Sequence, residues 1–307
     1  MRRLGLVAGV AAVGAAGLAA ALLARPDDAG AGWERAASMS LRRSYIASAE
    51  QAGYLYAAGG MVGETGRPLA TFARYDTRTD RWEVLPALPE ATRAAAAASV
   101  VGRIYVVGGT TAEGNTTALW AYQPGRRTWN RRAPMPAPLF NHGAVAYNRR
   151  LYVLGGFSEG RERRDVYAYE PLVDRWTRIS RLPRANHAFG VVAYEGELWV
   201  IGGRRGEEIL REVWILDLAT LAWRRGPALP EPMELLGATI AGDEIHAVWE
   251  STYQIHDGST GRWRDGPQPV VTRHALEAFA VDGVLYTVGG CTTALRDSPV
   301  VERLAID

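Results

Sequence analysis

Side chains suited to binding recur at one point of a repeated pattern, fifteen residues before a glycine pair or, where that pair is missing, before Trp249. These positions are Ser44, Arg93, Phe140, His187, Glu234 and His274, with Arg43, Asn141, His142 and Arg273 beside them. Arginine and histidine donate charge-assisted hydrogen bonds to carboxylates. A ring of such residues would bind an anionic sugar or an acidic peptide. The structural alternative is that each side chain caps a turn.

The residues that position this ring belong to a repeat. Trp33, Trp82, Trp129, Trp176, Trp223 and Trp263 follow one another at intervals of 49, 47, 47, 47 and 40 residues. Paired glycines stand at 59–60, 108–109, 155–156, 202–203 and 289–290, and the first four pairs precede the next tryptophan by 20 to 22 residues. Two marks in phase indicate one supersecondary unit that is copied along the chain.

Residues 94–132 show the content of one unit. A small apolar run, 94–101, leads through a Gly102-Arg103 turn into a β-rich run, 104–107, that ends at the glycine pair. Two further runs, 118–123 and 128–132, flank a Pro124-Gly125 turn. Short strands between glycine and proline turns predict antiparallel sheets, and four strands per radial repeat predict an all-β fold, the β-propeller.

Aromatic residues also keep a fixed interval within the unit. Tyr75, Tyr122 and Tyr169 each stand seven residues before a tryptophan. Glycine in a strand usually marks the close approach of another group. We therefore expect the tyrosine and tryptophan rings to pack between blades and to fill the space beside the glycine pairs.

This combination of marks resembles the kelch repeat family. The residues that carry the resemblance are Gly102, Ile104 to Gly109, Tyr122 and Trp129, and similar runs occupy 150–156 and 196–203. The resemblance covers roughly residues 32–307 and implies a kelch β-propeller.

The family also implies two kinds of enzyme. It includes exported, six-bladed sialic acid mutarotases, and this likeness implies Glu234 or Glu250 as the proton-transfer group and Arg93 or Arg273 as the carboxylate clamp. It also includes galactose oxidase-like copper enzymes, which need a cysteine crosslinked to a tyrosine. No Tyr-His pair lies near Cys291 in the sequence, so we expect no metal and no cofactor.

The two ends of the repeat array predict how the ring closes. The last unit stops after its third strand, whereas Trp33-Glu34-Arg35 is a fourth strand without a blade. An open ring would leave a bare sheet edge, which proteins avoid. We predict six blades, closed by this N-terminal outer strand pairing with the C-terminal blade.

The fifth unit departs from the pattern, because Trp249-Glu250 stands where a glycine pair is expected. Either the repeat has decayed at this point, or the relaxed constraint permits a ligand site.

The first 31 residues lie outside the repeat. Arg2-Arg3 precede 21 uncharged residues, 4–24, and Ala29-Gly30-Ala31 fits a small-x-small cleavage site. This pattern is typical of a secretory signal or an N-terminal membrane anchor. We expect an exported protein that is periplasmic, secreted or held at the membrane by this segment, with residues 32–307 as the propeller.

Composition narrows the function further. A net charge of +2 gives no field that would gather nucleic acid. Cys291 is the only cysteine, so no internal disulfide can form.

Taken together, these features of the sequence predict a propeller that binds an extracytoplasmic protein or glycan through its inter-blade loops without catalysis. The alternative is a mutarotase- or epimerase-like enzyme. The candidate ligand-binding residues are Arg43, Arg93, Asn141, His142, His187, Glu234, Arg273 and His274.

Overall fold

The computed structural model describes residues 32–63, 65–292 and 296–306. The segment 1–31, with its predicted signal or anchor, lies outside these ranges. Every regular element within them is a β-strand. The same ranges contain no helix that could span a membrane.

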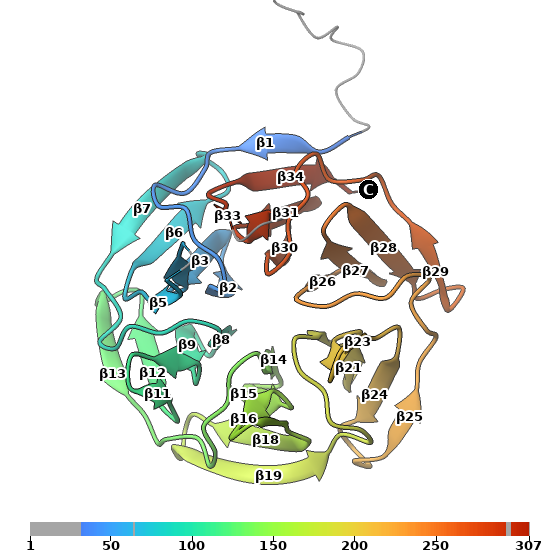
Figure 1. Ribbon diagram of the computed structural model, residues 1–307, viewed down its shortest axis with the longest axis horizontal. Helices are drawn as coiled ribbons and strands as arrows, with labels where there is room; N and C mark the ends of the chain where they lie inside the picture. The colour runs from blue at the N-terminus through green and yellow to red at the C-terminus, as the bar shows by residue number, and fades with distance from the viewer. Residues whose placement is uncertain (1–31, 64, 293–295, 307) are drawn as a thin grey trace, which may run out of the picture. The chain divides into compact units, whose positions relative to one another are not determined.

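Six four-stranded antiparallel sheets form a ring (Figure 1). We number the sheets as blades one to six from β2 onward. The innermost strands are β2 (Ala47–Gln51), β8 (Ala96–Val100), β14 (Gly143–Tyr147), β20 (Gly190–Tyr194), β26 (Gly237–Ala241) and β30 (Glu277–Val281). The second strands are β3 (Tyr54–Ala58), β9 (Arg103–Val107), β15 (Arg150–Leu154), β21 (Glu197–Ile201), β27 (Glu244–Trp249) and β31 (Val284–Val288).

The outer half of each blade is equally regular. The third strands are β6 (Phe72–Asp76), β12 (Leu119–Gln123), β18 (Asp165–Glu170), β24 (Val213–Asp217), β28 (Thr252–Asp257) and β34 (Val301–Ala305). The outermost strands are β7 (Arg81–Leu85), β13 (Thr128–Arg131), β19 (Arg175–Arg181), β25 (Trp223–Arg225), β29 (Arg262–Asp265) and β1 (Glu34–Ala36). The predicted six-bladed, all-β propeller is confirmed.

The core lies between the blades. The second strands are continuous apolar runs because both of their faces are covered, and Ile104 to Val107 are at most 1% exposed. Tyr56 and Phe72 of blade one share one hydrophobic cluster with Ile104 and Tyr122 of blade two. Each interface therefore stabilises two blades at once, as expected for a repeat protein.

The repeat tryptophans join neighbouring blades by hydrogen bonds. Each tyrosine predicted at the seven-residue interval lies opposite its tryptophan across the two outer strands, as in the Tyr122–Trp129 pair. The indole Nε1 atoms of five tryptophans donate to backbone carbonyls of the preceding blade or its connecting loop: Trp33 to Pro267, Trp82 to Ala37, Trp129 to Pro86, Trp176 to Ala133 and Trp263 to Pro227. The sixth, Trp223, donates to Ser180 Oγ.

The glycine pairs serve a different purpose from the predicted one. A Cβ at Gly59 would lie 2.3 Å from the backbone oxygen of Thr92, and one at Gly202 would lie 2.5 Å from that of Met233. The space beside these glycines is therefore filled by the loop that enters the next blade. The expectation that tyrosine and tryptophan rings fill it is wrong. Those rings pack between blades, as also expected, and Trp129 of blade two contacts Phe72 of blade one.

The ring closes as predicted. β1 pairs antiparallel with β34, with Glu34 opposite Arg303 and Ala36 opposite Val301. Figure 1 shows β1 as the outermost strand beside the C-terminal blade. The N-terminal strand therefore completes blade six.

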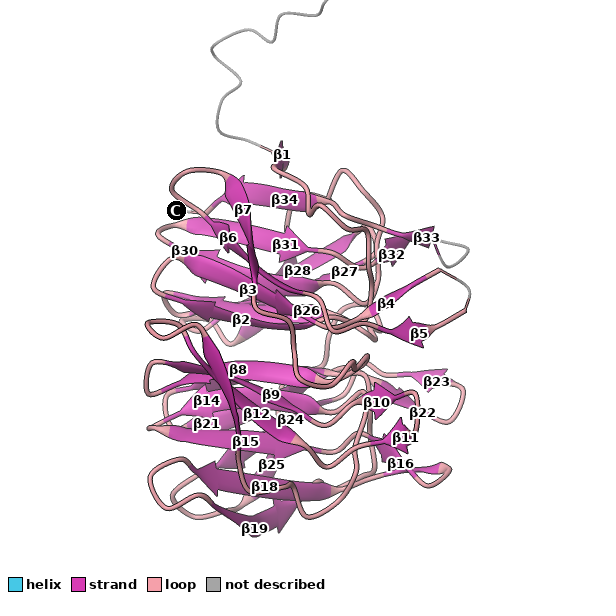
Figure 2. Cartoon of the chain, turned by 90° about the vertical axis from the view of Figure 1, so that its left-hand side faces the viewer, coloured by secondary structure: helices cyan, strands magenta, loops and turns pink. Residues whose placement is uncertain are grey.

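Small two-stranded hairpins project from five blades on one side of the ring (Figure 2). They are β4 (Met61–Val62) with β5 (Arg67–Pro68), β10 (Thr110–Thr111) with β11 (Gly114–Asn115), β16 (Phe157–Ser158) with β17 (Arg161–Glu162), β22 (Arg204–Arg205) with β23 (Glu208–Ile209), and β32 (Cys291–Thr292) with β33 (Arg296–Asp297). We call this side, which also carries the inter-blade loops, the upper face. In blade five β27 turns directly into β28 with Trp249 opposite Thr252, so no hairpin follows there.

Candidate functional site

A pocket of about 370 Å³ opens on the upper face beside blade five. Its polar and aromatic wall consists of Tyr45, Asn141, His187, Arg204, Glu234, Trp249, Glu250 and His274. Five of these residues, Asn141, His187, Glu234, Glu250 and His274, are predicted site residues. The pocket therefore gathers side chains from five blades that lie far apart in the sequence.

The inter-blade loops position these side chains through a repeated backbone conformation. One residue in each loop has positive φ, between 47° and 57°: Tyr45, Ala94, Asn141, Ala188, Leu235 and Ala275. The backbone N–H of each of the last five donates to the carbonyl of the one before it, at 2.6 to 3.0 Å. The residue just before each of these is the position predicted from the glycine spacing. Two of these predicted residues, His187 and His274, each form a β-bridge with the first residue of a projecting hairpin.

An ion pair forms one wall of the pocket. Arg204 donates through Nε and Nη2 to the two carboxylate oxygens of Glu234, both of which lie in a partly buried environment. This hydrogen bonding to Glu234 raises the pKa of Arg204. A bidentate pair of this kind is geometrically fixed, so Glu234 orients Arg204 at the pocket.

The missing glycine pair of blade five supplies a second wall. Glu250 takes the place of the second glycine with φ of 53°, and its backbone N–H donates to the carbonyl of Arg273 at 2.7 Å. Its Oε1 lies 3.9 Å from His274 Nδ1. Trp249 takes the place of the first glycine and lines the same pocket. The departure from the repeat therefore puts a carboxylate and an indole where the other blades have none.

The thiol of Cys291 contacts the imidazole ring of His274. The Cys291 Sγ lies 3.0 Å from His274 Nε2, and burial raises the pKa of the thiol to about 11. The Nδ1 atom on the other side of the His274 ring faces Glu250. The imidazole can therefore form a hydrogen bond with a ligand in the pocket.

His187 enters the pocket as a neutral ring. Burial lowers its pKa, and the ring meets Phe157 edge-on with centroids 5.4 Å apart. Its Nδ1 is buried without a hydrogen-bond partner. The pocket thus combines one fixed cation, two carboxylates, two imidazoles and two aromatic residues.

Comparison with known proteins agrees with this architecture. The model of the KLHDC2/KLHL20/DRC7 Kelch-repeats domain matches residues 46–248, about two thirds of the chain. The chain belongs to the kelch repeat family. The solved structure titled "Structure of YjhT" superposes on this kelch propeller with a TM-score of 0.76 at 15% identity, covering 85% of this chain and 94% of that one. No curated protein matches the sequence significantly. A kelch propeller is in general a scaffold for protein binding.

Two predicted ligand-binding arginines lie inside blades of the kelch propeller rather than in the pocket. Arg43 is 2% exposed and donates to the carbonyls of Gly59, Thr71 and Ala57. Arg273 is 0% exposed and forms an ion pair with Glu302 at 2.6 Å. Both stand one residue before the predicted loop position, where the side chain turns beneath the blade. Arg273 is therefore no carboxylate clamp on the surface.

His142 and Arg93 also lie outside the pocket. His142 is buried, its pKa is lowered to about 4 by burial, and its ring packs against Gly108 of the neighbouring blade. Arg93 lies on the upper face, but its Nη1 donates to Met61 Sδ at 3.6 Å. Their sequence neighbours Asn141 and Ala94 adopt positive φ, which turns adjacent side chains in different directions.

Sequence reasoning missed Tyr45 and Arg204. Arg204 directly follows the glycine pair 202–203, and the first residue after each pair begins a hairpin on the upper face. Tyr45 is the loop residue with positive φ in blade one. Counting forward from the glycine pairs would have found Arg204, and Tyr45 directly follows the predicted position Ser44.

Across the described ranges, no group of three or more His, Cys, Asp or Glu side chains has an arrangement that could hold a metal ion.

Proposed function

We propose that this kelch propeller is an exported binding protein that takes a sugar residue of a glycan into the upper-face pocket. A volume of about 370 Å³ suits one sugar ring rather than a flat protein surface. The N-terminal pattern of residues 1–31 supports export, since a charged start and an apolar run are typical of secreted proteins.

The composition of the pocket wall carries this proposal. Arg204, fixed by Glu234, can donate to a ligand carboxylate or hydroxyl, while Glu250 can accept from sugar hydroxyls. Trp249 and Tyr45 offer apolar ring faces of the kind that pack on the C–H face of a sugar. A wall that combines polar groups with aromatic rings matches an amphipathic, hydroxyl-rich ligand better than a hydrophobic one.

A second candidate is a sugar mutarotase or epimerase, and Glu250 is the residue that favours it. Glu234 is occupied by Arg204, whereas Glu250 makes no arginine ion pair among the described residues and lies 3.9 Å from His274 Nδ1. A carboxylate and an imidazole on one side of a bound sugar are a suitable base and acid for proton transfer. This assigns proton transfer to Glu250 and not to Glu234.

A glycan array followed by calorimetry on the full-length protein tests the binding function. We expect His187→Ala and Glu250→Gln each to weaken binding of the best glycan tenfold or more, about 1.4 kcal/mol, because each removes a polar pocket contact. Arg93→Ala is the matched control, since Arg93 lies on the same face outside the pocket, and it should leave affinity unchanged.

Other outcomes separate the alternatives. If no glycan binds, or if the two pocket variants bind like the wild type, the pocket is not the site. If a peptide library binds instead and is sensitive to both variants, the ligand is a protein. If the bound sugar exchanges anomers measurably by NMR and Glu250→Gln stops that exchange while retaining binding, the protein is an enzyme.

A further inference from the structure

The inner strand of blade six carries a carboxyl group at a position where the other blades have almost no side chain. Glu277 is the first residue of β30, and its equivalents are Ala47, Ala96, Gly143, Gly190 and Gly237. A Cβ at any of the three glycines would lie within 2.8 Å of the next blade. Those interfaces have no room for a side chain, so the interface between blades six and one must be wider.

The backbone is also open at this interface. Hydrogen bonds join the positive-φ loop residues of consecutive blades at five interfaces, from Tyr45 onward to Ala275. Among the hydrogen bonds of the described residues, none joins Tyr45 N to Ala275 O to complete the circle. We call the interface between β30 and β2 the seam.

Ser48 places an unpartnered hydroxyl in the seam. The residue is 7% exposed, and its Oγ is buried without a hydrogen-bond partner. Ala47 and Ala49 pack toward blade two, so strand alternation turns Ser48 and Glu50 toward blade six. Gly237 lies against Ala278, the equivalent of Ser48. By the same geometry, Glu277 stands opposite Ser48.

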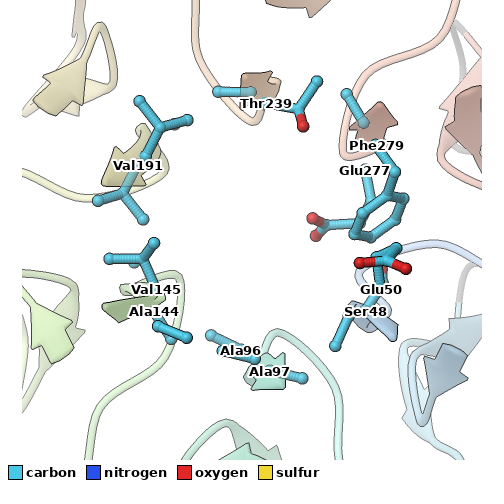
Figure 3. Close-up of a pocket in the computed structure, with 18 of the residues that line it drawn as sticks. Ser48, Glu50, Ala96, Ala97, Ala144, Val145, Val191, Thr239, Glu277 and Phe279 are labelled. Carbon is cyan, nitrogen blue, oxygen red and sulfur yellow. The ribbon is translucent and has the colours of Figure 1, made fainter. Parts of the chain in front are cut away.

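The seam opens into the central channel, a cavity of about 440 Å³. Figure 3 shows Glu277, Phe279, Glu50 and Ser48 together on one side of this channel, with the Glu277 carboxyl directed into it. Glu277 has no hydrogen-bond or ion-pair partner among the described residues. The remaining channel wall is mainly alanine and valine, and its described part contains no arginine or lysine.

We propose that the seam is a binding site for a primary alkylammonium group. The nitrogen would lie between the Glu277 carboxylate and the Ser48 hydroxyl, with Glu50 adding negative charge further along β2. The hydrocarbon stem would lie against Phe279 and the alanines of the channel. Ca²⁺ fits less well, because it takes six to eight oxygen ligands and the side chains of Glu277, Glu50 and Ser48 carry five oxygen atoms.

Protonation of Glu277 makes binding depend on pH. Burial raises the pKa of this carboxyl from 4.5 to about 8, so the group is mostly neutral at pH 7. The other titratable groups facing the channel and its upper opening are Glu50, Tyr45 and His142, and Arg78 and Asp282 lie beside Glu50 at the opposite opening. Burial keeps Tyr45 and His142 neutral. An ammonium ion must displace the proton of Glu277, so affinity rises with pH up to about 8 and then levels off.

The site is tested with n-butylammonium and the full-length protein, by ligand-observed NMR titration, with n-butanol as the uncharged control ligand. We expect n-butylammonium to bind roughly thirtyfold more tightly at pH 9 than at pH 6.5, following the ionised fraction of Glu277, since an amine stays charged at both values. Glu277→Gln should lower the affinity at pH 9 at least tenfold. Glu113→Gln, on an exposed hairpin, should not change it.

The pH dependence of protein stability tests the protonation of Glu277 without any ligand. Between about pH 4.5 and 8 the folded state holds a proton on Glu277 that the unfolded state has released. Wild-type stability should therefore fall as pH rises through this window, and the melting temperature of Glu277→Gln should not show that fall.

Equal binding of n-butanol and n-butylammonium, or undiminished binding by a folded Glu277→Gln protein, would overturn the proposal. This site is separate from the upper-face pocket, and a negative result here leaves the glycan proposal intact.

Discussion

Deleting residues 32–38 should lower the melting temperature of the full-length protein by about 10 °C or more. The deletion removes β1, so the edge of β34 loses its antiparallel partner. It also removes Trp33, which is 7% exposed, meets Tyr253 edge-on at 5.7 Å and donates from Nε1 to the carbonyl of Pro267 at 2.6 Å. Truncating a buried tryptophan alone typically costs about 3 to 5 kcal/mol.

Point variants separate the contributions of this N-terminal strand. Trp33→Ala should account for most of the loss, since the indole joins blades five and six in one hydrophobic cluster. Glu34→Ala is the matched control within β1. Its exposed ion pair with Arg303, at 3.2 Å, should contribute less than about 1 kcal/mol. The melting temperature is measured by differential scanning calorimetry. If the deletion leaves it unchanged, blade six is stable with three strands.

Arg273→Met should destabilise the propeller by about 3 to 5 kcal/mol in urea unfolding, because it leaves a buried carboxylate without its cation. Arg273 and Glu302 are both 0% exposed and lie 2.6 Å apart. The guanidinium also donates to the carbonyls of Gly289 and Val300 and to Thr287 Oγ1. Glu302 accepts only one further hydrogen bond in the described structure, from the backbone of Val271.

Arg43→Met provides the matched control for this prediction. Arg43 stands at the equivalent position of blade one, but its guanidinium bonds only to backbone carbonyls. Removing the Arg43 guanidinium leaves no buried charge without a partner, and blade five carries Met233 at this position. The free energy of unfolding should therefore fall by less, about 1 to 3 kcal/mol. The double variant Arg273→Met/Glu302→Gln should recover part of the loss. Equal effects of the two arginine variants would mean that the charge of Glu302 carries no penalty.

The repeat marks predicted the fold because each has a local physical cause. The tryptophan intervals hold because each indole bonds to the preceding blade, as Trp129 does to Pro86. The glycine pairs recur because a loop carbonyl of the next blade occupies the space of any Cβ, as at Gly59. These requirements are the same in every blade, so they appear as a period in the sequence. The unmatched strand at Trp33 then determined how the ring closes.

The sequence alone also located the upper-face loops, but only the tertiary structure decided which loop side chains reach the pocket. The side chains of adjacent residues in one loop point in different directions: Arg273 turns beneath its blade, and His274 faces the pocket. The positive φ of the residue that follows, Ala275 in this loop, sets these directions, and it has no signature in residue type. Arg204 meets Glu234 and Glu277 faces Ser48 only because separate blades are brought together around the ring. Spacing along a chain specifies what each blade contains, whereas a site between blades depends on contacts that no single repeat encodes.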